Sequence, residues 1–593
     1  MIEKGLEMYF IFVSSKGADL APISGIGKDS ISWCMPSGYE IKSEYHRKIS
    51  KGRILDLYGF HDDLDKCCSG QDRVGFFHGY LLGDEHPTIM NMDPAKSYYG
   101  VYSHGMVSKE DCYFATDEIG LSPLHYSNDE EVLMVSNNPH LIAIYKRMLG
   151  IKMRVESTLA VWHAVGITNE SNVTGYKGVF RVEPWRYIRI DVDGSILFPA
   201  KKRIGEGVSY EDLCYEGITE LRKGMMSVNS LFSDKRSQLT GGFDSRLVLS
   251  FIMDSGTVGD WQFETKGSMA NPDCMVATML AQRYGLNHNV GPRRDFRDER
   301  GDLDAYVKDA CMANAMESSL VRLQQFAGLR SSSVCLNGMG AAFAKSFGFA
   351  SSFRVFMQRK FRGTEIDFDH LNDEQYRAGY DCFGHADADR FYLNEDGLDV
   401  VREFRKYLFR FNYNRFQDNM NYADSMSAYR WRIHNCNLST LENNLVFLYS
   451  PVVLEASRKL DYRLRQDGKL YFDMMWRINP DLCFVPFENR VYNPELYREF
   501  PDQIKRLFKD IPPVTGSIVS ESQITFFDAI LPAMKEKLLD GLPSEVFDYV
   551  KREAVEERLA NNEGFGKPVF ALLGLYGVMK WYEIVEELNR SVG

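Results

Sequence analysis

Several chemical signatures are missing from this sequence of 593 residues. None of its 11 cysteines forms a CxxC pair, and neither an HExxH nor a GxxxxGKS/T motif occurs. These absences argue against a zinc knuckle, a zincin-type metal site and a Walker A loop. No apolar run reaches the roughly 18 residues that a membrane helix needs, and the first residues lack the basic start of a signal peptide. We therefore expect a cytoplasmic protein with no membrane span and with reduced cysteines.

Positive charge is also scarce. Lys and Arg number 70 against 82 Asp and Glu, which gives a net charge of −12, and the isoelectric point is about 5.6. Proteins that bind nucleic acid by neutralising phosphates usually show the opposite balance, so we expect no nucleic-acid partner. Hydrophobic residues make up 44% and charged residues 26%, which is an ordinary globular composition.

The pattern of apolar residues divides the chain into two parts. Before residue 205, short apolar or alternating runs are separated by turn signals, which predicts antiparallel strands in a sandwich. These runs are residues 8–13, 73–78, 101–107, 111–116, 132–136 and 187–192. After residue 205, expected helices at 210–229, 247–256 and 273–284 alternate with short expected strands at 237–239, 260–263 and 334–337. This alternation predicts a doubly wound parallel sheet, and helical spacing from about residue 370 onward predicts a helical lobe.

The sequence TGGFDSR, residues 240–246, lies between an expected strand and an expected helix. Two glycines allow the backbone to approach an anion closely, and the start of the following helix favours negative charge. The hydroxyl groups of Thr240 and Ser245 are further donors, and Asp244 can hold the magnesium that accompanies a nucleotide. We expect a phosphate-binding loop here; the alternative is a purely structural turn.

This loop resembles the SGGxDS pyrophosphatase loop of the asparagine synthetase superfamily. Three later stretches agree in order and spacing: FETKG at 263–267 followed by NPD at 271–273, LNGMG at 336–340, and YSPVV at 449–453. In the first half of the chain, ATDEIGLSPLHY at 115–126 is similar to the glutaminase-domain signature RDxxGxxPLYY.

The resemblance implies a fold, two domains and a set of site residues. Residues 1–205 would form a glutaminase-like α+β sandwich of the Ntn type, and residues 206–593 an α/β PP-loop ATP pyrophosphatase domain with a helical C-terminal lobe. The implied ligands are ATP and Mg²⁺, the latter bound by Asp244. The implied nucleotide-binding residues are Thr240, Gly241, Gly242, Asp244, Ser245, Thr265, Lys266, Gly267, Gly338 and Gly340. Lys345 would neutralise phosphate, and Arg490 would stabilise charge during acyl transfer.

Two positions depart from the family pattern. Members that hydrolyse glutamine expose a cysteine at the mature N-terminus, whereas position 2 here is Ile2, and Cys34 or Cys112 could replace it only by a rearrangement. We therefore expect the first domain to be a scaffold, as in the glutamine-independent branch that includes β-lactam synthetase and lasso-peptide cyclase. Moreover, Ala341 and Ala342 stand where the family usually has an acidic pair that helps to hold magnesium.

The expected activity is that of an ATP-dependent ligase. A substrate carboxylate attacks the α-phosphorus of ATP, giving an acyl-adenylate and pyrophosphate, and an amine then displaces AMP to form an amide. The carboxylate and amine would be small molecules or peptides in natural-product, peptide or surface-glycan biosynthesis, and the protein partners a second copy or a pathway protein. One alternative is a degenerate homologue that acts as a nucleotide-binding or protein scaffold. Another is an enzyme that adenylates a base in RNA, which the acidic composition disfavours.

Overall fold

The computed structural model describes residues 8–16, 41–60 without 51, 73–164 without 84–86, 172–291, 333–338, 391–409, 444–488 without 461–463 and 466, 513–516, 531–561 without 533, and 567–591. It also describes the single residues 20, 23 and 344 and short pieces between 304 and 316 and between 357 and 375. No helix among these residues has the length and apolarity needed to cross a membrane.

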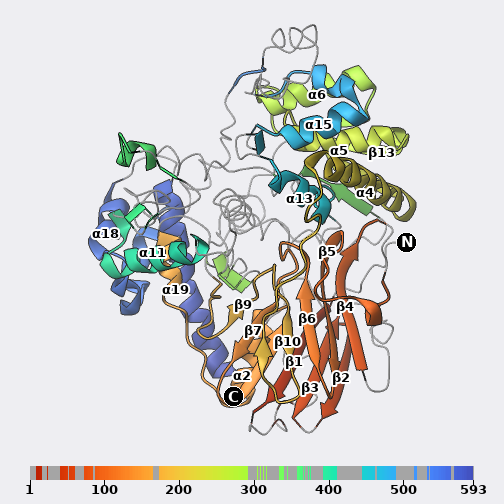
Figure 1. Ribbon diagram of the computed structural model, residues 1–593. Helices are drawn as coiled ribbons and strands as arrows, with labels where there is room; N and C mark the ends of the chain where they lie inside the picture. Colours follow the sequence, from red (N-terminus) through yellow and green to blue (C-terminus); the bar gives the residue numbers. More distant parts are fainter. Residues whose placement is uncertain are drawn as a thin grey trace.

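The first part of the chain is a sandwich of two antiparallel sheets (Figure 1). One sheet has the order β2-β3-β1-β8-β7-β9 and the other the order β11-β10-β6-β5-β4. The strands are β1 (Met8–Ser15), β2 (Ser43–Ser50), β3 (Arg53–Gly59), β4 (Arg73–Leu81), β5 (Gly100–Ser108), β6 (Cys112–Thr116), β7 (His125–Asn128), β8 (Val132–Ser136), β9 (Phe180–Arg181), β10 (Ile188–Ile190) and β11 (Ile196–Leu197).

Strand β1 shows why the sandwich forms. Successive side chains of a strand point to opposite faces. Phe10 and Phe12 lie in the core between the two sheets, while Ile11 and Val13 lie in a second core on the outer face of the first sheet. Because both faces are buried, the strand is apolar throughout, as the run at residues 8–13 predicted.

Helices cover the outer face of the first sheet. They are α2 (Pro139–Met148), α3 (Leu159–Ala164) and α19 (Lys567–Ser591), and α19 packs against both α2 and α3. The indole N–H of Trp581 donates to the backbone oxygen of Gly175 at 2.8 Å. Residues from both sides of the expected boundary at 205 therefore share one core.

The second part contains a parallel sheet in the order β14-β13-β12-β15-β16. Its strands are β12 (Asp234–Gln238), β13 (Trp261–Lys266), β14 (His288–Gly291), β15 (Ser333–Leu336) and β16 (Asn444–Leu445). The associated helices are α4 (Tyr210–Leu231), α5 (Phe243–Asp254), α6 (Pro272–Tyr284), α13 (Pro451–Arg458) and α15 (Lys469–Ile478). In chain order the strands run 3-2-1-4-5, which is the doubly wound order, so the prediction of a parallel sheet is confirmed.

The structure differs from the sequence prediction in two respects. Seven of the strands that the structure describes were not predicted, namely β2, β3, β7, β9, β11, β14 and β16. Among the residues described beyond 370, the helices also do not gather in the single lobe that was expected: α13 packs against α4, and α15 against α5. By contrast, α11 (Glu395–Phe409) and α19 both contact α3, which covers the sandwich. The hydrophobic surface that each helix has to cover decides its position, and helical spacing alone does not reveal that surface.

Candidate nucleotide site

The loop at residues 240–242 joins β12 to α5 at the carboxyl edge of the parallel sheet. Strand β12 has β13 on one side and β15 on the other, so the chain reverses its direction across the sheet at this strand. Ligands of doubly wound folds bind in the crevice outside the carboxyl ends at such a switch point. Helix α5 begins at Phe243, four residues earlier than predicted, so the second half of TGGFDSR forms its first turn.

Hydroxyl groups fix the conformation of this loop. The side-chain oxygens of Thr240 and Ser245 lie 2.9 Å apart. The backbone N–H of Thr240 donates to Oγ of Ser245 at 3.0 Å, and the N–H of Gly242 donates to Oγ1 of Thr240 at 3.3 Å. Both hydroxyls thus hold the turn into the helix, and each retains further hydrogen-bonding capacity.

The two glycine-rich turns meet. A Cβ atom on Gly338 would lie 2.5 Å from Cβ of Asp244 and 2.9 Å from the backbone nitrogen of Ser245. On the other side of the loop, a Cβ on Gly241 would lie 2.8 Å from Cβ of Glu488. Only glycine allows these segments to approach so closely.

The end of the neighbouring strand β13 contributes Thr265, Lys266 and Gly267. The Thr265 hydroxyl donates to the backbone oxygen of Leu239 at 2.6 Å and lies 2.8 Å from Nε2 of His288. It thereby ties together the ends of three adjacent strands. Lys266 is exposed beside it, and Gly267 has a φ of 146°, which side chains disfavour.

Three carboxylates surround the glycine loop. Oδ1 of Asp273, in the first turn of α6, accepts the backbone N–H of Gly241 at 2.9 Å. Glu488 lies against Gly241 through its side chain, and its N–H donates to the Gly241 oxygen at 3.2 Å. Asp244 stands at the start of α5. No three potential metal-binding side chains cluster in the part of the chain that the structure describes.

Arg246 lies below the loop and is fully buried. Its guanidinium donates to the backbone oxygens of Val485 at 2.7 Å, Pro486 at 2.8 Å, Leu482 at 3.2 Å and Gly241 at 3.4 Å. Its Cζ also stands 3.7 Å from the ring centroid of Phe487. Arg246 therefore packs against the segment that precedes Glu488 and holds it to the loop.

Comparisons with known proteins add little to this geometry. No family model matches the chain, and no curated protein does either. The solved structures that it resembles include one described as the allosteric regulatory enzyme of purine biosynthesis, with 10% identity, a TM-score of 0.21, and 48% of this chain and 80% of that chain covered. Another is the glutamine phosphoribosylpyrophosphate amidotransferase from B. subtilis complexed with ADP and GMP, with 12% identity, a TM-score of 0.21, and 60% and 80% covered. Likeness at this level supports no conclusion about activity.

The predicted site residues fall into two groups. The first group lies at the carboxyl ends of β12, β13 and β15 and consists of Thr240, Gly241, Gly242, Asp244, Ser245, Thr265, Lys266, Gly267 and Gly338. Gly340, Lys345 and Arg490 lie outside the described residues, as do Ala341 and Ala342.

Sequence reasoning missed Asp273 and Glu488 as neighbours of the loop. Asp273 belongs to the stretch NPD at 271–273 that the sequence analysis named, and Glu488 lies two residues before Arg490. The proximity of Asp273 had a local signal, since a helix that follows the next strand of a parallel sheet begins at the same edge. Glu488 had none.

Cys112 lies in the core of the sandwich and is not exposed. Burial raises the pKa of its thiol to about 11, so the thiolate is scarce at neutral pH and the residue is unsuited to nucleophilic catalysis. Cys34 and Ile2 lie outside the described residues.

Proposed function

We propose that this protein is an ATP-dependent ligase that adenylates a substrate carboxylate and transfers it to an amine. The observation that carries the proposal is the meeting of two glycine turns, at Gly241 and Gly338, beside a helix start at the switch point of a parallel sheet. Close backbone approach combined with a helix N-terminus suits a phosphate chain.

Different residues of the site would bind different parts of the nucleotide. Thr240, Gly241, Gly242 and Ser245 would hold the pyrophosphate part of ATP. Asp244 would bind magnesium, which, when bound, neutralises charge on the phosphate oxygens. The fit to the metal rests on one carboxylate, that of Asp244 at the start of α5, because no three potential metal ligands cluster among the described residues; oxygens of the nucleotide phosphates would supply further ligands. Thr265, Lys266 and Gly267, at the next strand end, would lie toward the nucleoside.

The proposed chemistry needs orientation and charge stabilisation from the protein. The substrate carboxylate forms a bond to the α-phosphorus while the bond to pyrophosphate breaks; the amine then forms the amide bond and AMP leaves. We assign Lys345 to the pyrophosphate and Arg490 to the acyl transfer. We also propose that nitrogen comes directly from an amine and not from glutamine, because Ile2 replaces the nucleophilic cysteine.

Two observations favour a second candidate, a nucleotide-binding or protein scaffold without turnover. The N–H of Gly241, a natural donor to phosphate, already donates to Asp273, and the sequence has Ala341 and Ala342 in place of an acidic pair. A loop held in this way could bind a nucleotide without supporting departure of pyrophosphate.

Calorimetric titration with a non-hydrolysable ATP analogue and magnesium tests the proposal. We expect a micromolar Kd, about −8 kcal/mol, weakened at least tenfold by Asp244→Ala. Asp254→Ala is the matched control, because Asp254 lies at the other end of α5 and pairs with Arg222 on the surface. Absence of binding by the wild type would refute the proposal. Binding without pyrophosphate release from ATP, in the presence of any carboxylate and amine tried, would favour the scaffold.

A further inference from the structure

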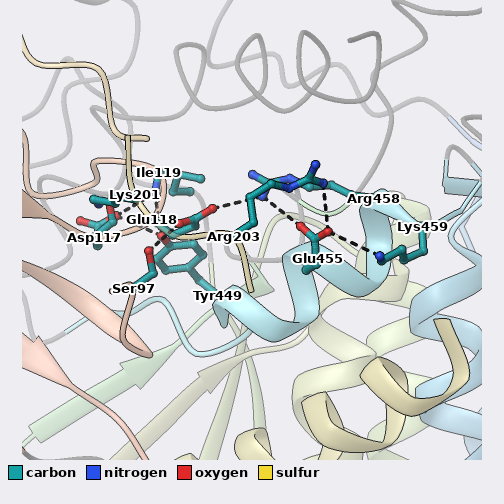
Figure 2. A network of polar contacts seen from close by, with 10 residues as sticks. All are labelled: Ser97, Asp117, Glu118, Ile119, Lys201, Arg203, Tyr449, Glu455, Arg458 and Lys459. Carbon is teal, nitrogen blue, oxygen red and sulfur yellow. Dashed lines mark hydrogen bonds and ion pairs between the residues drawn. The ribbon is translucent and has the colours of Figure 1, made fainter. Parts of the chain in front are cut away.

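The sandwich contacts the second part of the chain through a buried turn after β6. The Asp117 carboxylate, fully buried, accepts the backbone N–H groups of Leu121 at 2.9 Å and Ser122 at 2.8 Å. It also accepts the hydroxyl of Tyr449 at 3.1 Å, and that hydroxyl in turn accepts the N–H of Ile119 at 2.8 Å (Figure 2). One phenol group thus binds both the carboxylate and the backbone of the turn.

A chain of charges continues from this turn to α13. Glu118 pairs with Arg458 at 3.1 Å and accepts the Ser97 hydroxyl at 2.5 Å. Arg458 lies 3.4 Å from Glu455, which Arg203 approaches to 3.2 Å (Figure 2). Glu455 is 2% exposed. Because breaking a buried ion pair leaves an uncompensated charge, these contacts restrict the position of α13 relative to the sandwich.

The same helix reaches the candidate site. The Ser457 hydroxyl donates to the backbone oxygen of Ala344 at 2.5 Å, and Nε of Arg465 donates to the Ser457 oxygen at 3.0 Å. Tyr471 forms a second hydrogen bond with the backbone of Ala344. The backbone at Ala344 is therefore held from two helical segments.

Ala344 follows the second glycine turn closely along the chain. Gly338, six residues earlier, packs against Asp244 of the TGGFDSR loop. The Asp244 carboxylate also acts on the buried Tyr471, whose pKa is raised first by burial and then by that charge. Ala344 is thus linked to the sandwich through Ser457 of α13, and Tyr471 interacts both with Ala344 and with the charge of Asp244.

We propose that Glu118 and Tyr449 are positioning residues for the candidate site. They hold α13 against the sandwich, and α13, through Ser457, sets the position of the segment at Ala344 next to the second glycine turn. This inference rests on the proposed function for its effect on ligand binding, but the mechanical link stands on its own. It gives the sandwich a role that needs no nucleophile.

Hydrogen exchange measured by mass spectrometry on the full chain tests the link without any ligand. Tyr449→Phe removes a single hydroxyl, and Glu118→Gln removes a charge at nearly constant shape. Both should accelerate exchange about tenfold in peptides that contain Ala344 and α13, which corresponds to about 1.4 kcal/mol, and leave β1 and β3 unchanged. Lys202→Gln is the control, because it breaks only an exposed pair with Asp93 in the same sandwich.

Titration with the magnesium-bound ATP analogue supplies the second measurement. If the wild type binds, Tyr449→Phe and Glu118→Gln should each weaken binding about fivefold to tenfold, while Lys202→Gln leaves it unchanged. If the wild type does not bind but exchange near Ala344 accelerates as expected, the proposed function fails and the link stands. Unchanged exchange near Ala344 in both variants, or acceleration spread equally over the whole protein, overturns the inference.

Discussion

Replacing Arg246 by methionine offers the sharpest test of how the glycine loop is held. The guanidinium is fully buried and donates to four backbone oxygens, of which those of Val485 and Pro486 are closest at 2.7 and 2.8 Å. Methionine keeps an unbranched apolar chain but has neither a donor nor the charged group that lies over the Phe487 ring. Arg246→Met therefore leaves these oxygens without their charged donor.

The size of the effect follows from those two short bonds. A hydrogen bond from a charged group contributes about 1.5–3 kcal/mol, so the pair accounts for about 3–6 kcal/mol. Removing a buried charge returns part of this through relief of desolvation. We expect a net loss of about 2–5 kcal/mol in the free energy of local unfolding. Arg246→Lys keeps the charge but cannot reproduce the forked geometry, so its loss should be smaller but still above about 1 kcal/mol.

Native-state hydrogen exchange of α5 and of residues 482–488 measures this free energy locally. Arg222→Met is the control, because Arg222 forms a bidentate pair with Asp254 at the surface, where such pairs contribute at most about 1 kcal/mol. If Arg246→Met and Arg222→Met changed the exchange of these segments equally, the four carbonyl contacts would not hold the loop.

Two further substitutions test separate features. Gly338→Ala places a methyl group 2.5 Å from Cβ of Asp244 and should weaken binding of the ATP analogue. Gly259→Ala is the control and should leave binding unchanged, because a methyl group there meets open space. If calorimetry gave both variants the same affinity for the analogue, the close approach of the two turns would be contradicted. The pKa of His46 is raised in the folded protein, mainly by its hydrogen bond to Asp56. The protonated imidazole therefore stabilises the fold fully at pH values below its pKa in the unfolded chain, about 6.5. This stabilisation is lost as the pH rises through the pKa of the folded state. The difference in thermal midpoint between the wild type and His46→Asn should thus be larger at about pH 5.5 than at about pH 8.5. A larger difference at the higher pH would count against the interaction between His46 and Asp56.

Local signals in the sequence predicted the loop and most of the helices around it. Asn271 and Gly285 mark the ends of α6 by capping. Strand β12 was predicted only in part, because its residues 234–236 are Asp, Lys and Arg, a charged sequence that suggests a surface turn. Tertiary contacts override that signal: β12 pairs on both sides, and Lys235 is buried while its amine reaches Asp260 at 3.5 Å.

The parts of the site that sequence reasoning missed depend on contacts between distant segments. Nothing near Glu488 in the sequence indicates that it lies against Gly241. Its place follows from the backbone oxygens at 482–486 that converge on Arg246. Similarly, Tyr449 belongs to the stretch YSPVV, which was noted only for its resemblance to the family, and its bond to Asp117 appears only when the two parts of the chain meet.

The packing of α19 on the sandwich has a consequence for biosynthesis. Trp581 and its neighbours cover the outer face of the sheet that contains β1, yet they leave the ribosome long after that sheet has been made. Until then, the apolar side chains of Ile11 and Val13 have no cover from α19. We expect ribosome-bound chains that stop before residue 567 to carry a sandwich that proteases cleave and chaperones recognise, although all its strands have been synthesised.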